Sequence, residues 1–349
     1  MNLSKSLVFS LLLLFAAFSL FLSCSSDEDE PVIYLENVEV SYITPAQAPA
    51  VDGVLEPIWQ AASATQLISE SGSDYNPSNK LALVNISALC DSEYVYISAS
   101  WKDVTMNDRF LQLIWNNQQG WNRPNISKED NISFMFLPVD GSTTDNDPNC
   151  FAMCHTPSLI MLNETGRPVD GWYWRASLTD SIFRAVDMWL VDTLDADTSF
   201  LGLDTEFNPG YMFNAQDSSA VPKFWKGEIQ VDTIVVNEDT TFTVDNGKCL
   251  LDTDTATYTS FPMGVDIDSV VVPSFVTFTN ASGSRWDVEA KGVWDEVSGR
   301  WTVEFKRLLN TGNDDDIEFV IGEQIRMAVA IGDNTKHAHI GFKPFILEF

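Results

Sequence analysis

The chain has 349 residues, 45% of them hydrophobic, and carries 50 acidic but only 20 basic side chains, which gives a formal net charge of −30. So acidic a chain repels nucleic acid and argues against it as a partner, whereas it suits a well-solvated exported protein that attracts basic partners or divalent cations. The length and the hydrophobic fraction suffice for one large β domain or two smaller ones.

The N-terminus predicts a signal for export. Lys5 precedes an apolar run from Leu7 to Leu22, and a small residue stands directly before Cys24. This order is typical of bacterial lipoproteins, in which the cysteine receives lipid and becomes the first residue after cleavage. We therefore expect residues 1–23 to be a lipoprotein signal peptide. A retained membrane anchor is the alternative, because the run could just cross a thin bilayer.

An acidic tether follows the cysteine. Residues 24–40 include the stretch Ser25-Ser26-Asp27-Glu28-Asp29-Glu30, which a solvated spacer would also have. The stretch resembles the signal that sends Bacteroidetes lipoproteins to the cell surface. We expect the protein to be anchored to the outer membrane through lipid on Cys24, on the periplasmic or the cell-surface face.

Residues 41–349 predict an all-β domain. Short runs of β-branched and aromatic residues recur between Asp, Asn, Gly and Pro turns, and long helical periodicity is scarce. Such runs favour one antiparallel β-sandwich over a βαβ fold. No Gly-rich phosphate loop and no Gly-x-Ser-x-Gly elbow occurs, so we expect neither a nucleotide site nor a serine triad. The predicted strands are Leu81–Leu89, Tyr94–Trp101, Ile132–Leu137, Phe275–Phe278, Arg285–Val293, Trp301–Arg307 and Arg326–Ile331.

The composition shifts toward Asp and Thr between about residues 191 and 262, which predicts an insertion in the sandwich. Alternation of residue types there indicates one additional hairpin rather than a structureless loop. Asn246-Gly247 is a good turn for it.

Two acidic runs are candidates for calcium. Asp252 with Asp254, and the run Asp314, Asp315 and Asp316, offer the oxygen ligands that calcium prefers. Neither run has the full spacing of a calcium loop. A solvated acidic turn is the alternative for both.

A cysteine-histidine segment is the strongest functional motif. Cys150 and Cys154 are separated by three residues, and His155 follows directly. In c-type cytochromes two cysteines form thioethers with the porphyrin and the adjoining histidine ligates the iron, commonly as Cys-x-x-Cys-His. With the extra residue, both sulfurs still share one face of a helix. We predict covalent haem c. A local Cys150–Cys154 disulfide and half of a zinc site are the alternatives.

Two cysteines remain if Cys24 carries lipid and the cysteine-histidine segment carries haem. Cys90 and Cys249 would then be the two cysteines left over, and in an oxidising compartment two thiols can form a disulfide with each other. Two separate buried thiols are the alternative.

Several segments, taken in order, resemble one group of proteins. Residues 52–59, Asp-Gly-Val-Leu-Glu-Pro-Ile-Trp, and residues 87–103 look like the opening of the sandwich shared by DOMON-like domains, family-nine carbohydrate-binding modules and the haem-binding subunit of ethylbenzene dehydrogenase. Residues 129–136 resemble the central strand of that sandwich. Residues 170–176, Asp-Gly-Trp-Tyr-Trp-Arg-Ala, and residues 292–334 resemble later strands of the ethylbenzene dehydrogenase-like group. The resemblance implies an immunoglobulin-like or DOMON-like sandwich, here in a c-type haem variant.

The resemblance also bears on the axial ligands of the iron. In the ethylbenzene dehydrogenase subunit it implies methionine and lysine as ligands of a non-covalent haem. Here Met135 lies on the strand that resembles the methionine region, and Lys336 and His337 lie near the place of the lysine. This chain departs from that pattern by adding His155 and its cysteines, so we expect His155 as the proximal ligand. Only His337 and His339 remain as histidines, and on a strand they would share a face. For the distal ligand we rank His337 first, His339 second and Met135 third; a solvent-exposed histidine pair is the alternative.

We therefore predict an extracytoplasmic c-type haem lipoprotein that transfers electrons and has no catalytic residue of its own. Its partner would be another redox protein, and the resemblance suggests a molybdenum oxidoreductase. The alternative is a surface carbohydrate-binding lipoprotein with a structural Cys150–Cys154 disulfide. Most of the eleven tryptophans lie in strand-like contexts that favour core packing, so Trp115 and Trp121, in a polar loop, are the candidates for stacking on a sugar.

Overall fold

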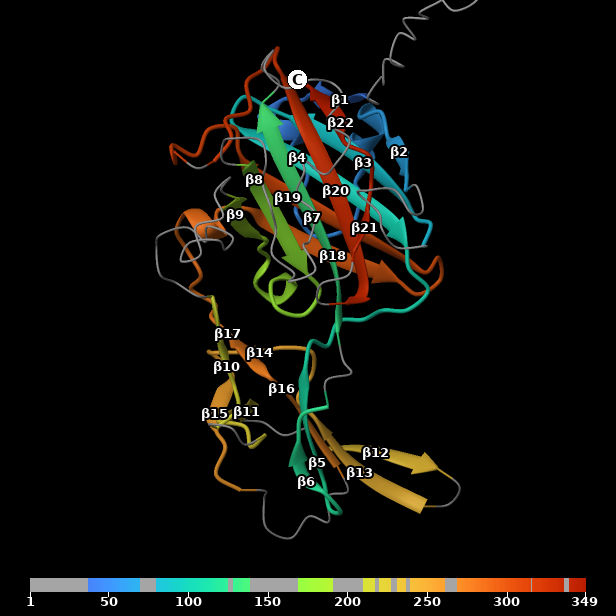
Figure 1. Ribbon diagram of the computed structural model, residues 1–349, viewed down its shortest axis with the longest axis vertical. Helices are drawn as coiled ribbons and strands as arrows, with labels where there is room; N and C mark the ends of the chain where they lie inside the picture. The colour runs from blue at the N-terminus through green and yellow to red at the C-terminus, as the bar shows by residue number, and fades with distance from the viewer. Residues whose placement is uncertain are drawn as a thin grey trace, which may run out of the picture. The chain divides into compact units, whose positions relative to one another are not determined.

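The computed structural model consists of β-strands and short 3-10 turns, and its largest sheet holds twelve strands (Figure 1). It describes residues 37–69, 80–124, 128–138, 169–190, 210–216, 220–226, 231–236, 239–260, 269–314, 316–335 and 339–349. In this described part of the chain, no helix is long and apolar enough to cross a membrane. The 3-10 turns are η1 (Pro45–Gln47), η2 (Pro57–Ala61), η4 (Asp180–Ile182) and η5 (Ser284–Trp286).

The largest sheet runs through ten strands in one continuous order, and two short strands pair beside this path. In that order the strands are β18 (Glu289–Asp295), β19 (Arg300–Leu308), β4 (Tyr94–Lys102), β3 (Leu83–Cys90), β1 (Asn37–Tyr42), β22 (Phe345–Glu348), β20 (Gln324–Thr335), β7 (Glu129–Pro138), β8 (Val169–Arg175) and β9 (Val186–Leu190). The short strands are β2 (Thr65–Ile68), which pairs with β3, and β21 (Ile340–Gly341), which pairs with β20.

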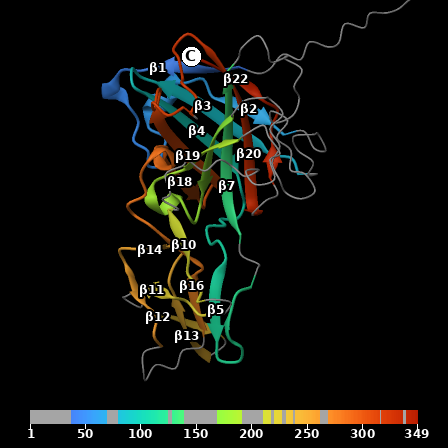
Figure 2. The same ribbon diagram turned by 60° about the vertical axis from the view of Figure 1, so that its left-hand side comes forward.

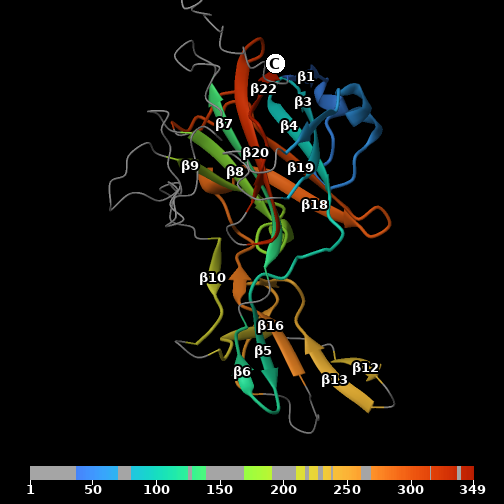
Figure 3. The same ribbon diagram turned by 45° about the vertical axis from the view of Figure 1, so that its right-hand side comes forward.

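Strand β1 joins the two halves of this sheet. It pairs in parallel with β22 through its first three residues and with β3 through its last three. The other neighbours in the order are antiparallel. The sheet curls, so that the half with β3, β4 and β19 packs against the half with β20, β7 and β8 around one buried core (Figure 3). The fold is therefore an antiparallel β-sandwich, as predicted.

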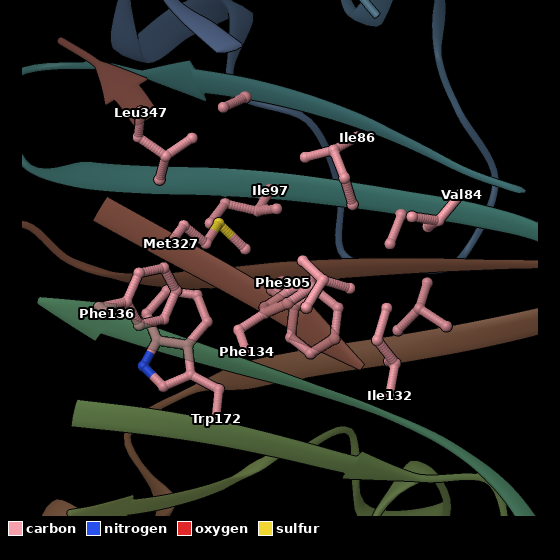
Figure 4. Packing of buried hydrophobic residues seen from close by; sticks show 14 of the residues in the cluster. Val84, Ile86, Ile97, Ile132, Phe134, Phe136, Trp172, Phe305, Met327 and Leu347 are labelled. Carbon is pink, nitrogen blue, oxygen red and sulfur yellow. The ribbon is translucent and has the colours of Figure 1, made fainter. Parts of the chain in front are cut away.

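Alternation along the strands builds the core between the two halves (Figure 4). On β7, Ile132, Phe134 and Phe136 face inward, and the residues between them face the opposite side. The ring centroid of Phe134 lies 4.7 Å from that of Phe305 on β19, and the centroid of Phe136 lies 4.7 Å from that of Trp172 on β8. Burial of each such ring stabilises the fold by roughly 1.5–3 kcal/mol. The core thus determines which side of each strand faces outward.

Tryptophans extend this core, as the sequence predicts. The rings of Trp101, Trp174 and Trp301 pack together with centroids 5.2 to 6.5 Å apart. Gly292 allows the close approach of Trp174, because a Cβ at that position would overlap the indole ring. The other buried tryptophans of the sandwich are Trp59, Trp172 and Trp286.

Three smaller sheets are built from residues 112–122 and 211–277, and the five-stranded one combines these two stretches, which are distant in sequence (Figure 2). Leu113 of the first stretch and Leu250, Val270 and Val276 of the second share a separate buried cluster. The five-stranded sheet has the order β12 (Val231–Val236), β13 (Asp239–Asp245), β16 (Ser269–Pro273), β5 (Gln112–Asn116) and β6 (Gly120–Asn122). The other two sheets are β10 (Tyr211–Phe213), β17 (Phe275–Thr277) and β14 (Leu250–Leu251), and the pair β11 (Phe224–Lys226) with β15 (Thr255–Thr257).

The predicted strands agree with the structure except at two points. Arg285 lies in the turn η5, so the strand predicted to begin there begins only at Glu289. The predicted additional hairpin is present as β12 and β13. Asn246-Gly247 is not its turn: Gly247, with φ +81°, follows β13, because β13 pairs onward with β16 and the chain must leave the sheet there.

Candidate functional site

The outer face of β7 carries the predicted methionine ligand. Met135 points away from the core, because Phe134 and Phe136 on either side of it face inward. Its partners across the strands are Gly171 of β8 and Ala328 of β20. A hydrogen atom and a methyl group therefore flank the half-buried thioether.

A second thioether lies in the same row. Met188 of β9 pairs with Gly171 from the side opposite to Met135. The residue before it, Asp187, is buried and bonded to Arg307, so Met188 faces the outer side together with Met135. Sequence reasoning missed Met188. Met188 is recognised from the pairing of both methionines with one glycine. The residue pattern of a single strand does not reveal this pairing.

Two polar side chains lie on either side of this row. Tyr173, on the same face of β8 as Gly171, has a pKa raised to about 12 by burial, so its phenol stays protonated. Arg326, on the same face of β20 as Ala328, pairs with Leu137 and is 2% exposed. The outer face therefore combines soft thioether donors with a neutral phenol and a buried positive charge.

Most of the residues predicted for haem binding, and the predicted lipidation site, fall outside the described part of the chain. They are Cys24, Cys150, Cys154, His155 and His337. In sequence, the cysteine-histidine segment lies within the connection from β7 to β8, the two strands that carry Met135 and Gly171. Haem attachment and lipidation at these residues stay predictions.

His339 is half-buried and directly precedes β21. The next residue, Ile340, pairs with Ile331 of β20. His339 is therefore level with the residue of β20 that comes four positions after Ala328. It is also two strands away from Met135. The two backbone positions are thus roughly 16 Å apart, from the rise along a strand and the spacing between strands. Side chains on one face do not reach a common iron over that span, so Met135 and His339 are alternatives and not a pair.

Trp115 and Trp121 lie on strands, which corrects the prediction of a polar loop. They face each other across the hairpin of β5 and β6. The Trp121 Nε1–H donates to the Tyr258 hydroxyl at 3.3 Å, and the Tyr258 ring stands edge-on to Trp225. Both tryptophans pack against the smaller buried cluster. The polar residues 117–119 form the tip of the hairpin, and the tryptophans lie on the strands that lead into and out of it. Their contacts are those of core packing, and carbohydrate binding by them stays a prediction.

Cys90 and Cys249 are separate buried thiols and form no disulfide. The Cys249 sulfur instead contacts the Thr277 hydroxyl at 3.2 Å. Burial raises the pKa of both thiols, which makes them poor nucleophiles. Of the two readings that the sequence left open, the structure has the pair of inert thiols.

The acidic run at Asp252 and Asp254 makes turn contacts. The N–H and the hydroxyl of Thr279 both donate to Asp252 Oδ1 at 2.9 Å. The N–H of Leu251 donates to Asp254 Oδ1 at 3.0 Å. Calcium binding at this run stays a prediction.

Asp316, from the other acidic run, belongs to a buried cluster around Arg307. The Arg307 Nη1 lies 2.6 Å from Asp170 Oδ2, 3.1 Å from Asp187 Oδ2 and 4.0 Å from Asp316 Oδ1. Burial disfavours the charged guanidinium, but the carboxylates outweigh it and raise the pKa of Arg307. An internal arginine thus occupies the centre of this cluster. Its remaining contacts are the rings of Trp172 and Phe319 and the carbonyl oxygen of Ile317.

The family model described as ethylbenzene dehydrogenase matches residues 56–343. No curated protein matches this chain. Among solved structures it is similar to a family-9 carbohydrate-binding module from Caldicellulosiruptor kristjanssonii in complex with glucose, at 9% identity and a TM-score of 0.33, over 89% of this chain and 85% of that one. It is also similar to a Bacteroides uniformis protein described as carbohydrate-binding, at 6% identity and a TM-score of 0.35, over 90% of each chain.

Structural overlap this low says nothing about what this chain binds. The family match is different in kind, since it extends from the residue before η2 to the segment after β21 and includes every strand that carries the thioether row. The chain belongs to the ethylbenzene dehydrogenase family.

Proposed function

We propose that the protein binds haem on the outer face of β7, β8 and β20 and carries electrons as an exported, lipid-anchored protein. The observation that carries the proposal is Met135, a thioether flanked by Gly171 and Ala328 on the strand that leads into the cysteine-histidine segment. Membership of the ethylbenzene dehydrogenase family supports it. The partner in this proposal is another redox protein.

Each residue of the segment has a role in the proposal. Cys150 and Cys154 hold the porphyrin through thioethers, and His155 supplies the proximal nitrogen. The distal ligand is His337, His339 or Met135. The described geometry favours Met135 over His339, because the connection that contains His155 starts from the strand of Met135.

The described residues fit a haem. Thioether and imidazole groups are common axial ligands of haem iron, and the residues that flank Met135 across the strands are the small Gly171 and Ala328. Bound haem supplies a one-electron couple, whose potential depends on the ligands and on burial. Carrying an electron requires no acid or base, so no catalytic residue is needed.

Haem staining on a denaturing gel tests the attachment, after export in a host that matures c-type cytochromes. We expect staining to survive denaturation in the wild type and to be lost or reduced in Cys154→Ala. Cys249→Ala is the matched control, because it removes a buried thiol outside the segment, and it should keep the stain. Full staining of Cys154→Ala would show that the segment is wrongly assigned.

Absorbance spectra then identify the distal ligand. Met135→Leu removes the sulfur but keeps the size of the side chain, and it should convert a six-coordinate spectrum to a five-coordinate one if Met135 is the ligand. Met188→Leu, in the same row, is the control and should leave the spectrum unchanged. A spectrum that changes only in His337→Ala would assign the distal position to His337.

Carbohydrate binding is the alternative outcome. If the gel stays dark although a control cytochrome matures in the same host, absorbance of the native protein tests for non-covalent haem. Without any haem absorbance, quenching of tryptophan fluorescence by glycans would support a carbohydrate-binding lipoprotein.

A further inference from the structure

Three aspartates from distant parts of the chain converge at one end of the sandwich. Asp103 follows β4, Asp130 is the second residue of β7, and Asp333 lies near the end of β20. One carboxylate oxygen from each lies within 4.8 Å of the other two. Asp103 and Asp130 are buried, whereas Asp333 is exposed at the rim.

Strand pairing explains why these residues meet. Strand β20 pairs with β7 up to Gly332 opposite Asn131, and the register then shifts before Thr335. Within this irregularity Asn334 has φ +46°, and its N–H donates to Asp130 Oδ1 at 2.9 Å. The shift presents Asp333 at the end of the sheet, next to Asp130.

Two uncharged side-chain oxygens join the carboxylates. The hydroxyl of Thr105 lies 3.4 Å from Asp103 Oδ1 and 3.1 Å from Asn107 Oδ1. The backbone N–H of Asn107 donates to Asp130 Oδ2 at 2.7 Å, which holds this loop against β7. The stretch Asp103-x-Thr105-x-Asn107 therefore directs three oxygen-bearing side chains toward the same end.

The cluster has no internal cation among the described residues. Asp130, 0% exposed, accepts hydrogen bonds only from neutral groups: two backbone N–H groups and the Trp301 indole, the latter at 2.9 Å. Asp103 is 7% exposed, and its buried Oδ2 has no hydrogen-bond partner in the described part of the chain. Lys80, a largely exposed side chain, lies at the rim of the cluster, where its Nζ is 3.1 Å from Asp333 Oδ2.

A buried carboxylate oxygen without a donor is costly for the fold unless a positive charge compensates it. The orphaned Asp103 oxygen thus points to a ligand that is positively charged.

We propose that these five side chains bind a calcium ion. Calcium takes six to eight oxygen ligands from carboxylates, amide carbonyls, hydroxyls and water in flexible geometry, whereas magnesium demands a smaller octahedral site and keeps its waters. The oxygen-only donor set disfavours transition metals, which prefer nitrogen or sulfur. The ion ties the ends of β4, β7 and β20 together and links the two halves of the sandwich. This site is separate from the thioether row and does not depend on haem.

The test is calcium titration by calorimetry on the full mature protein after removal of divalent ions with EDTA, paired with thermal unfolding. We expect a calcium site of defined stoichiometry and a rise of Tm with CaCl₂. Asp103→Asn and Asp333→Asn should each weaken calcium binding about tenfold or more, because each removes a charged ligand. Asp333 is exposed, so its variant folds even if the substitution at Asp103 does not.

Glu289→Gln is the matched control. Glu289 forms a rim ion pair with Lys306 at 3.5 Å, and its side chain is 43% exposed, the same fraction as that of Asp333. This variant should bind calcium like the wild type. The proposal is overturned if calcium does not bind, if it binds Asp333→Asn as tightly as the wild type, or if MgCl₂ at equal concentration gives the same heat and the same Tm shift.

Discussion

The sandwich contains two groups of three aspartates that differ in how their charge is compensated. Asp170, Asp187 and Asp316 surround Arg307, whose guanidinium is fully buried with them. We call this group the arginine cluster. Asp103, Asp130 and Asp333, which we call the open cluster, have the exposed Lys80 at their rim and no internal cation among the described residues.

The difference teaches how one fold can keep buried carboxylates in two ways. In the arginine cluster the compensating charge is covalently part of β19 and is present whatever the solution contains. In the open cluster, by our proposal, it comes from dissolved calcium. Stability should therefore respond to calcium through one cluster and not through the other.

Removal of Arg307 should have the largest effect. Arg307→Met keeps much of the side-chain volume but leaves Asp170 and Asp187 buried without their cation, which should lower the free energy of unfolding by about 3–5 kcal/mol. Chemical denaturation measures this loss. Lys306→Met, next in sequence, removes a partly exposed ion pair with Glu289; it is the control and should cost less than about 1 kcal/mol. Equal effects of the two substitutions would contradict the central role of Arg307.

The arginine cluster should also make stability depend on pH, independently of calcium. Burial raises the pKa of Asp287 to about 6; Arg307 and a hydrogen bond with Asp187 oppose the shift, and the charges of Asp316 and Asp170 add to it. A carboxyl whose folded-state pKa is raised stabilises the fold below its unfolded-state pKa of about 3.9, and this contribution is lost as the pH rises through about 6.

Asp287→Asn should therefore remove about 1–2 kcal/mol of the fall in the free energy of unfolding between pH 4 and pH 7. Denaturation curves at a series of pH values, with and without CaCl₂, measure it. An unchanged pH slope in the variant would show that Asp287 titrates normally in the fold.

Neutralisation of one carboxyl in the open cluster should act in opposite directions with and without calcium. In EDTA, Asp103→Asn relieves repulsion with Asp130 and Asp333 and should raise the free energy of unfolding by about 1 kcal/mol. In CaCl₂ the variant should be less stable than the wild type, because it binds the ion more weakly. Asp316→Asn, in the arginine cluster, is the control and should show no difference between the two buffers. A destabilised Asp103→Asn in EDTA would mean that Asp103 is already compensated within the fold.

The smallest effect belongs to the rim of the open cluster. Lys80 and Asp333 form an exposed ion pair at 3.1 Å, with side chains 62% and 43% exposed. Exposed pairs contribute little, so Lys80→Met should change the free energy of unfolding by no more than about 0.5 kcal/mol. A loss of several kcal/mol in EDTA would show that Lys80 is the cation of this cluster and would remove the need for calcium.

The strands were predictable because their signal is local. Alternation around Phe134 and Phe136 indicates both the strand β7 and the inward direction of these rings, and it follows that Met135 faces outward. The turn at Asn246-Gly247 misled, since a good turn sequence does not say which strands it joins. Trp115 and Trp121 were misplaced for a similar reason: the polar residues between them are the tip of a hairpin, and the pairing partner of the hairpin lies far away in sequence.

By itself, the sequence determined the β-sandwich class, most of its strands, the packing of tryptophans in its core and the presence of a cysteine-histidine segment between the strands now seen as β7 and β8. Only the tertiary structure decided that Met188 and Met135 share one glycine, that Arg307 enters one aspartate cluster, and that Asp103, Asp130 and Asp333 form another without it. The physical reason is that side-chain alternation and turn preference act between neighbours in the chain, whereas strand register and charge compensation act between neighbours in space.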